Sequence, residues 1–151
     1  MSSSLTISCI QLAHAKDLPL PSYESASAAG MDLRVALESP LTILPGQRVL
    51  LPTGLKLAIP EGYEVQIRPR SGLAIKHGIT MLNSPGTIDA DFRGELHLIA
   101  INHGQEAYTV QHGDRMAQMV VQKVHQAQLI QVQELDETTR GEQGFGSTGV
   151  S

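Results

Sequence analysis

Residues 60–104 decide how this chain folds; they read PEGYEVQIRPRSGLAIKHGITMLNSPGTIDADFRGELHLIAINHG. Polar and apolar residues alternate over residues 64–68, so Val65 and Ile67 would face a core. The same alternation begins again in residues 95–102 and then becomes continuously apolar, as in a strand buried on both faces. Turn residues separate these segments. Short strands divided by turns predict an all-β sandwich or barrel.

The same pattern continues outside this stretch. Residues 71–77 are the one segment in which we expect a helix, with Ser71 as its N-cap and Gly78 at its C-terminal end. Residues 115–121 place apolar side chains on both sides of one strand, as in a sandwich interior or a subunit interface. The chain therefore consists mainly of short strands, and one of them is suited to an interface.

The composition agrees with a single small domain. The 151 residues are 41% hydrophobic but only 3% aromatic, so the core must be mostly aliphatic. A small domain with a limited core often gains stability by association, and we therefore expect an oligomer.

Composition also excludes several classes of protein. The longest unbroken apolar run, residues 98–101, is far too short for a transmembrane helix, and the N-terminus lacks the features of a secretory signal. The single cysteine, Cys9, forbids an internal disulfide, so a reducing, cytoplasmic location is expected. With a net charge of −4, the chain has no broad basic face for a nucleic-acid polymer.

Two short segments combine glycine with a charged residue. In residues 29–33, Asp32 either satisfies the amides of a turn or lies close to a metal ion. In residues 69–74, Arg70 and Ser71 precede the expected helix, where amides, a hydroxyl and a guanidinium together suit an anion. The alternative for this second segment is a capped helix with a surface arginine.

Two further segments are rich in polar groups. Residues 83–94 form a hairpin in which Asn83 and the turn amides could read the edge of a heterocycle, and a half-buried Asp89 could orient a water molecule. The alternative is an acid that only satisfies the hairpin. In residues 113–119, Asp114 would pair with its neighbour Arg115 or with turn amides. Gln118 lies among apolar residues and must find hydrogen-bond partners if it is buried.

The last segment is the glycine-rich end of the chain. Its composition over residues 138–149 cannot build a core, so it is either a frayed end or a segment that orders over a ligand. Glycine lets backbone amides approach phosphates, and Phe145 offers a ring that can stack on a base.

No other motif indicates a known chemistry. The six histidines show no metal-ligand spacing, and Walker, Rossmann and serine-elbow motifs are absent from the sequence. The residues able to bind phosphate are scattered, so folding or assembly must bring them together.

Taken together, in this order and at these spacings, the five segments resemble the homotrimeric dUTPase family from about Ala29 to Gly149. The resemblance implies an all-β fold, the β-clip or distorted jelly-roll, over residues 1–137. Residues 138–151 would form a flexible tail that closes over the active site. It further implies a homotrimer with active sites shared between subunits, and hydrolysis of dUTP with Mg²⁺ to dUMP and pyrophosphate. Such an enzyme would limit uracil in DNA and supply dUMP for thymidylate synthesis.

The resemblance also implies a role for individual residues. Asp89 would activate the attacking water, Gln118 would contact the α-phosphate, and Asp32 would hold a hydrated Mg²⁺ through water. The tail would place Phe145 on uracil and Arg140 on the γ-phosphate. The substrate-binding residues would be Arg70, Ser71, Gly72, Asn83, Thr87, Ile88, Asp89, Phe92, His97, Arg140, Phe145, Gly146, Ser147 and Thr148.

The chain departs from the family pattern at two positions. Phe92 stands where many members have tyrosine, which keeps the ring but loses a phenolic hydrogen bond. Gln143 replaces a glycine that is usual in the tail, which restricts how the tail folds down.

Two alternatives remain at this point. A dCTP deaminase of the same fold would need a general acid and base in the base pocket. A non-catalytic nucleotide-binding trimer would need neither Asp89 nor the tail. Because both features are present, the sequence favours the hydrolase.

Overall fold

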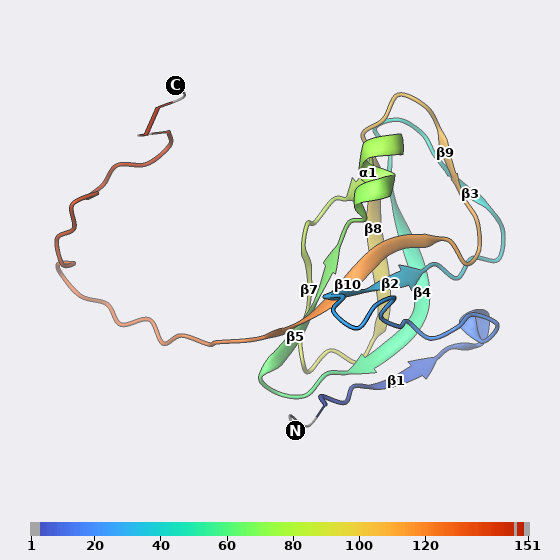
Figure 1. The fold of residues 1–151 in the computed structure, drawn as a ribbon, viewed down its shortest axis with the longest axis horizontal. Helices are drawn as coiled ribbons and strands as arrows, with labels where there is room; N and C mark the ends of the chain where they lie inside the picture. Colours follow the sequence, from blue (N-terminus) through green and yellow to red (C-terminus); the bar gives the residue numbers. More distant parts are fainter. Residues whose placement is uncertain (1–3, 147, 150–151) are drawn as a thin grey trace.

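Antiparallel strands make up most of this computed structural model, which describes residues 4–146 and 148–149 (Figure 1). The elements in chain order are β1 (Ser8–Gln11), η1 (Ala13–Ala15), β2 (Gly30–Arg34), β3 (Leu41–Ile43), β4 (Arg48–Ala58), β5 (Tyr63–Arg68), α1 (Ser71–His77), β6 (Ile79–Met81), β7 (Gly86–Ile88), β8 (Glu95–Asn102), β9 (Tyr108–Val110) and β10 (Arg115–Lys123). The all-β prediction is confirmed.

The strands form two four-stranded sheets and one ribbon. The first sheet has the order β1-β4-β8-β6, the second has the order β2-β10-β5-β7, and β3 pairs with β9. Every pairing is antiparallel. Strand β10 therefore lies inside the second sheet, with β2 on one side and β5 on the other.

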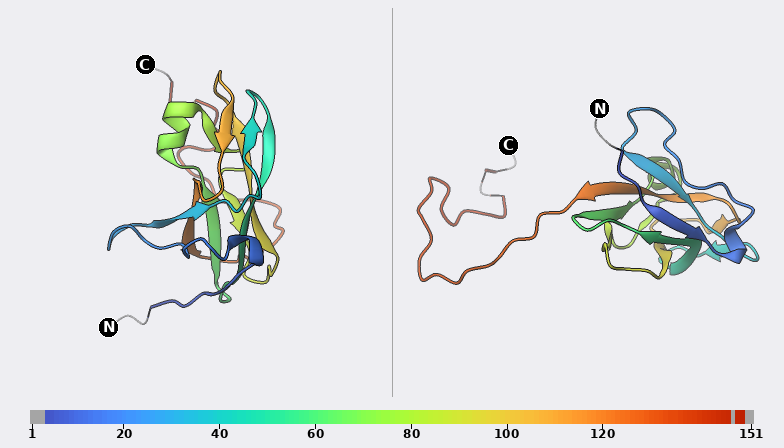
Figure 2. Two further views of the ribbon diagram at one scale, coloured as in Figure 1. Left: turned by 90° about the vertical axis from the view of Figure 1, so that its right-hand side faces the viewer. Right: turned by 90° about the horizontal axis from the view of Figure 1, so that it is seen from below.

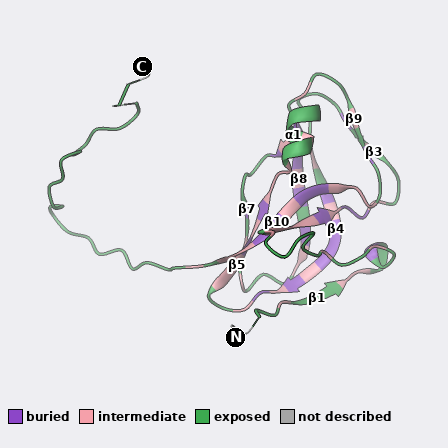
Figure 3. Cartoon of the chain, viewed as in Figure 1, coloured by how far each residue is buried: buried purple, intermediate pink, exposed green. Residues whose placement is uncertain are grey.

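The core between the sheets is aliphatic, as the composition predicts. Val65 and Ile67 of β5 are 0% and 4% exposed, so the alternation over residues 64–68 is confirmed. Strand β8 spans the expected residues, and its last three are all buried. Purple segments along the central strands in Figure 3 mark this core. It draws on both sheets, and its fully buried side chains include Leu33, Leu51, Leu98, Val110 and Met116.

Strand β10 contains an irregularity that matters for the site. Its pairing with β2 shifts between Arg115 and Ala117, and the two consecutive residues Met116 and Ala117 are both buried. Such a bulge adds one residue to a strand and re-aims the side chains before it. As a result, Arg115 and Gln118 lie on the same outer face of the second sheet.

Helix α1 begins at Ser71, one residue earlier than a helix capped by Ser71 would begin. Ser71 is the first helical residue and Arg70, with an extended backbone, occupies the N-cap position, so the prediction of Ser71 as N-cap is wrong. The Arg70 carbonyl accepts the first helical hydrogen bond, from the Ala74 amide at 3.1 Å. Gly78 ends the helix in the left-handed conformation (φ 68°), as predicted.

Beyond Lys123 the chain leaves the sheets. The described residues of this arm contain no helix or strand, and those after Val124 are all exposed. Figure 1 and the right-hand view of Figure 2 show the arm extending away from the sheets. The start of the tail at residue 138 stays a prediction, because the chain is already extended before that point.

No helix among the described residues is long and apolar enough to cross a membrane.

A hydrogen bond between a histidine and a carboxylate links two loops outside the sheets and gives a pH-dependent prediction. His112 Nε2 lies 2.9 Å from Asp17 Oδ2, and this hydrogen bond is the main cause that lowers the pKa of Asp17 below 3.8. A carboxyl group whose pKa is lower in the folded than in the unfolded chain stabilises the fold at pH values above its ordinary pKa. This stabilisation is lost as the pH falls through the pKa of the folded state. Asp17→Asn should therefore lower the melting temperature slightly above about pH 5, and this difference should shrink as the pH falls through the lowered pKa of Asp17.

Thermal unfolding across this pH range measures the effect. Glu38→Gln, at an exposed carboxylate of a nearby loop, is the control and should show no comparable pH-dependent difference. An Asp17→Asn difference that does not shrink as the pH falls would contradict the hydrogen-bond explanation.

Candidate active site

A half-buried carboxylate between two guanidiniums lies at one end of the second sheet. Asp32 Oδ1 is 3.1 Å from Arg70 Nε, and Asp32 Oδ2 is 3.5 Å from Arg115 Nη1. The Asp32 side chain is 22% exposed. Arg70 Nη1 also donates to the Arg115 carbonyl at 2.9 Å. We call Asp32, Arg70, Arg115 and Gln118 the Asp32 cluster.

Gln118 belongs to this cluster because of the strand register. It pairs with Asp32 on β2 and with Arg68 on β5, so the three side chains lie on the same outer face. Its Nε2 donates to the Pro69 carbonyl at 3.0 Å, which confirms that this amide finds a partner. A Cβ on Gly30 would lie 2.5 Å from Gln118 Oε1, so the side chain occupies space that only glycine leaves open.

The face around Gln118 is strongly basic. Arg34 pairs with Arg115 across β2 and β10, and Arg68 pairs with Gln118, so these two arginines join Arg70 and Arg115 on this face, against the two acids Asp32 and Glu24. Guanidiniums with N–H donors to spare bind anions such as phosphate or carboxylate. The alternation of strands β2 and β5 could have indicated Arg34 and Arg68, but the bulge that turns Arg115 outward has no clear sequence signal.

Asp114 does not pair with Arg115. Instead its Oδ2 accepts a hydrogen bond from the Gln111 amide at 2.8 Å. This confirms the alternative that Asp114 binds a turn amide. The pairing of Arg115 with Asp32 therefore corrects the alternative of an Asp114–Arg115 pair.

The hairpin acid lies at a different place. Asp89 follows β7 and lines a hollow of about 770 Å³ between the hairpin, the turn before β5 and the start of the arm. Asp89 is exposed, so the expectation of a half-buried acid is wrong for the single chain, because β7 ends at Ile88 and no described residue covers the next position. The hollow is acidic; its charged lining residues are Glu61, Glu64, Asp89, Asp91 and Arg93.

Sheet geometry separates the hollow from the Asp32 cluster. Strand β7 pairs with β5 on the side away from β10. Ile88 pairs with Val65, while Gln118 pairs with Arg68, three residues further along β5. At roughly 3.3 Å per residue, this offset alone is about 10 Å, before the width of the intervening strands is added. Within one chain, Asp89 is thus not brought to Asp32, Arg70 and Gln118.

The other hairpin residues lie near Asp89. Asn83 and Thr87 are exposed, and β7 is an edge strand, so one row of its backbone N–H and C=O groups is free of ladder partners. The Phe92 ring lies across Gly94, where a Cβ would come within 2.6 Å of it. The hairpin therefore combines unpaired polar backbone with an aromatic wall.

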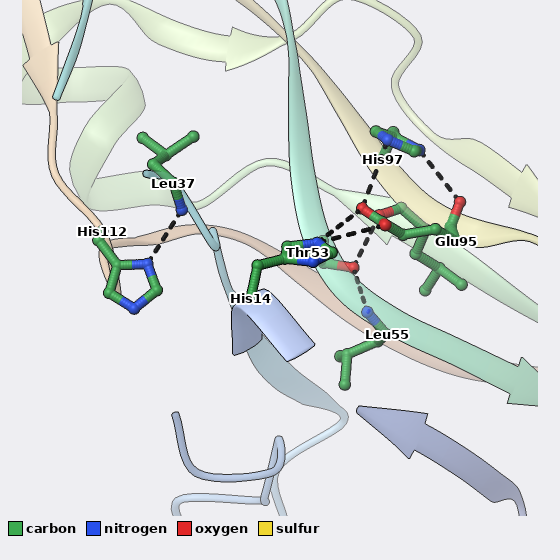
Figure 4. A network of polar contacts seen from close by, with 8 residues as sticks. His14, Leu37, Thr53, Leu55, Glu95, His97 and His112 are labelled. Atoms are coloured by element: carbon green, nitrogen blue, oxygen red, sulfur yellow. Dashed lines mark hydrogen bonds and ion pairs between the residues drawn. The ribbon is translucent and has the colours of Figure 1, made fainter. Parts of the chain in front are cut away.

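His97 lies neither in the Asp32 cluster nor beside the hairpin residues around Asp89. It is on β8 in the first sheet, where its Nε2 is 3.4 Å from Glu95 Oε2 and its Nδ1 is 3.1 Å from the Glu95 carbonyl. His14 Nε2 contacts the same carboxylate at 3.3 Å, and Figure 4 shows Glu95 between the two imidazoles. The structure does not bring this predicted nucleotide contact to the remaining site residues.

The tail residues are far out on the arm. Arg140, Phe145, Gly146 and Thr148 are exposed, and Arg140 Nε donates to the Gln143 carbonyl at 2.8 Å. Ser147 lies outside the described residues. Ser71 and Gly72, by contrast, are exposed directly beside Arg70.

For a metal ion, the chain offers little of its own. Among residues 4–146 and 148–149, no three His, Cys, Asp or Glu side chains are placed to hold one. Asp32 forms ion pairs with two guanidiniums, and a carboxylate has about four acceptor positions, so it retains capacity for bound water. An ion held mainly by a ligand and by water would fit beside it.

Comparisons with known proteins identify the family of the chain. The dUTPase family model matches residues 16–149. A deoxyuridine 5′-triphosphate nucleotidohydrolase of Rhizobium etli is 56% identical over 96% of this chain and 94% of its own length. One from Fusobacterium nucleatum is 53% identical over 93% and 96%. A solved dUTPase of Staphylococcus bacteriophage 80alpha with dUPNHPP has a TM-score of 0.86 and 26% identity, covering 96% of this chain and 99% of that one.

The space at Gly30 provides a test of Gln118. A methyl group at this position would displace the flexible end of Gln118 without a backbone clash, so Gly30→Ala should change the free energy of unfolding by less than about 1 kcal/mol. If the amide position matters, dUTP turnover should fall about 10- to 100-fold. Ser27→Ala, in the exposed segment before β2, is the control. Full activity of Gly30→Ala would show that the Gln118 position is not required.

Proposed function

The chain belongs to the dUTPase family, and from this premise we propose which of its residues carry out each part of the reaction. It is a dUTP nucleotidohydrolase. In the proposal, water attacks the α-phosphate, and the products are dUMP and pyrophosphate. The observation that carries the proposal is the basic Asp32 cluster on a chain whose net charge is −4.

The Asp32 cluster binds the phosphates. A nucleoside triphosphate has up to about four negative charges, which require several strong donors in one place. Arg70 has N–H groups beyond those that contact Asp32 and the Arg115 carbonyl, and Ser71 and Gly72 lie exposed beside it. Gln118 retains one amide N–H that can donate to the α-phosphate, and its Oε1 can accept a hydrogen bond from the attacking water.

The hairpin binds the nucleoside. A pyrimidine edge and a sugar are uncharged and so tolerate the acidic hollow. The free backbone edge of β7 from Thr87 to Asp89, together with Asn83, offers the fixed donors and acceptors that distinguish one base from another. Phe92 forms the wall on the sugar side, and Asp89, exposed and close by, acts as the general base.

An Asp32 cluster and a hairpin from different copies complete one site. In a single chain these groups are separated, and one is basic while the other is acidic, which favours their contact across an interface. A homotrimer with sites shared between subunits satisfies this requirement. The roughly 22 residues from Lys123 to Phe145 can span about 70 Å when extended, enough for the tail to close over a neighbour's site.

The arm also supports association. Its apolar side chains are strongly exposed in the single chain; Leu129, Ile130, Val132 and Leu135 are 95%, 73%, 57% and 84% exposed. An apolar hollow of about 310 Å³ lies on the body, and its lining includes Ile7, Leu20, Tyr23, Met31 and Val121. Exposed apolar surface of this kind usually marks an interface.

Mg²⁺ is the proposed cofactor. Asp32 would hold the hydrated ion through water, while the substrate phosphates supply direct ligands. When bound, the ion stabilises the negative charge that grows on the departing pyrophosphate.

Several earlier expectations remain predictions within this proposal. They are the cytoplasmic location, the absence of nucleic-acid or membrane partners, and the role in limiting uracil in DNA. The alternatives of a dCTP deaminase and of a non-catalytic trimer are set aside because the chain is a dUTP nucleotidohydrolase.

Asp89→Asn tests the general base. Loss of the carboxylate should lower turnover of dUTP about 100- to 10,000-fold while nucleotide affinity changes little, because the base acts on the water rather than on the substrate. Steady-state kinetics and calorimetric binding of a non-hydrolysable analogue measure the two effects. Asp91→Asn, on the same hairpin, is the control and should retain most activity. Survival of turnover in Asp89→Asn would exclude this assignment.

Mixed oligomers test the shared site. Asp89→Asn and Arg70→Gln should each be nearly inactive alone, because each lacks one part of every site. After random mixing of equal amounts of the two chains, about one site in four would combine an intact hairpin with an intact Asp32 cluster. Activity should therefore rise to about a quarter of the wild-type value.

Mixing the double variant with wild type is the control for subunit exchange. In that mixture also, about a quarter of the sites should remain intact. If exchange is shown by mass spectrometry but the two single variants do not complement each other, each site is built from one chain.

A further inference from the structure

Arg115 contacts both members of the Asp32–Arg70 ion pair. Its Nη1 lies 3.5 Å from Asp32 Oδ2, and its backbone carbonyl accepts a hydrogen bond from Arg70 Nη1 at 2.9 Å. The side chain thus faces the carboxylate while the main chain holds the neighbouring guanidinium. No other residue of the cluster makes contact with both.

The bulge in β10 is what places Arg115 there. Without the register shift, strict alternation from Gln118 back to Arg115 would turn the arginine toward the core. With Met116 and Ala117 both buried, Arg115 instead projects from the same face as Asp32. A bulge that interrupts a central strand in order to expose one charged side chain indicates a specific use for that side chain.

The charges around Asp32 suggest what this use is. A carboxylate beside a phosphate site repels the incoming anion, and one arginine only neutralises it. The second arginine makes the group of Asp32, Arg70 and Arg115 positive by one charge. The three side chains are between 22% and 39% exposed, so solvent screens these charges only in part.

The donors of Arg70 lead to the same conclusion. A guanidinium has five N–H groups, and in Arg70 the Nε faces Asp32 while Nη1 faces the Arg115 carbonyl. The remaining donors are available to phosphate. If Asp32 lost its second arginine, both of its oxygens could engage Arg70 in the paired geometry that carboxylates and guanidiniums favour. Arg70 would then have fewer donors for the substrate.

We propose that Arg115 is a positioning residue for polyphosphate binding: it occupies the second oxygen of Asp32, compensates its charge, and so keeps Arg70 available to the triphosphate. This inference rests on the proposed role of the Asp32 cluster as the phosphate site. It assigns to Arg115 an effect that grows with the number of phosphates on the ligand.

Binding of a ligand series tests this effect. For Arg115→Gln, the dissociation constant of a non-hydrolysable dUTP analogue should rise about tenfold, whereas that of dUMP should rise less than about threefold. The KM for dUTP should rise with the analogue constant, while kcat at saturation changes little. Arg115→Lys keeps the charge and should recover most of the affinity.

Glu24→Gln is the matched control. Glu24 Oε1 lies 3.8 Å from Arg115 Nη1, but its side chain is 67% exposed and it does not contact Asp32 or Arg70. Removing its charge should leave both dissociation constants within about twofold of wild type. A change as large as that in Arg115→Gln would show that any charge near Arg115 has this effect.

Three results would overturn the proposal. They are an equal loss of affinity for dUMP and for the analogue, a fall in kcat without a change in KM, or an Arg115→Lys variant no better than Arg115→Gln. If Arg115→Gln does not fold, Arg115→His measured against wild type at about pH 5.5 and pH 8 gives the same comparison, because its charge is then present or absent.

The same experiment separates this inference from the proposed function. If the wild-type chain binds the analogue but does not hydrolyse dUTP, the proposed reaction fails while the effect of Arg115 on phosphate binding is still measured. If binding is normal in Arg115→Gln and the wild-type chain hydrolyses dUTP, only the positioning role fails.

Discussion

The hydrogen-bond register of β10 between β2 and β5 is the constraint on which the site depends. It places Gln118 opposite both Asp32 and Arg68, on the face turned away from the core. A slip of one residue would exchange the two faces and bury these polar groups in an aliphatic interior. The buried partners on the opposite face, such as Leu33 and Ala117, fix the register because they have nowhere else to pack.

The second organising feature is the separation of charge on a single chain. Although the net charge is −4, the charges are unevenly distributed: a basic cluster lies at one end of the second sheet and an acidic hollow lies at the hairpin. The basic surface suits an anionic triphosphate, and the acidic surface tolerates a neutral base and sugar. Because the sheet keeps the two surfaces apart in one chain, the proposed reaction and the proposed assembly support each other: a second copy would bring the two parts of the site together, and the opposite charges of the two surfaces favour that contact.

Short-range patterns in the sequence predicted the strands well. The alternation in residues 64–68 gave β5, and the apolar run in residues 95–102 gave β8 with its bounds. Predictions failed where distant groups compete with local ones. Ser71 is not the N-cap, because Arg70 takes that position while its side chain reaches Asp32 and the Arg115 carbonyl. The role of His97 as a nucleotide contact stays a prediction; in the single chain its imidazole lies beside Glu95 of the same strand.

The sequence by itself determined the fold class, the aliphatic core and the suitability of Arg70 and Ser71 for an anion, because periodicity and residue type are local properties; only the resemblance to a family joined Asp32 and Gln118 to them. Only the tertiary structure decided that Asp89 lies apart from them and that Arg115 joins them. Both outcomes depend on which strands are neighbours and on a one-residue bulge. These are set by the packing of the whole sheet, and no window of the sequence contains that information.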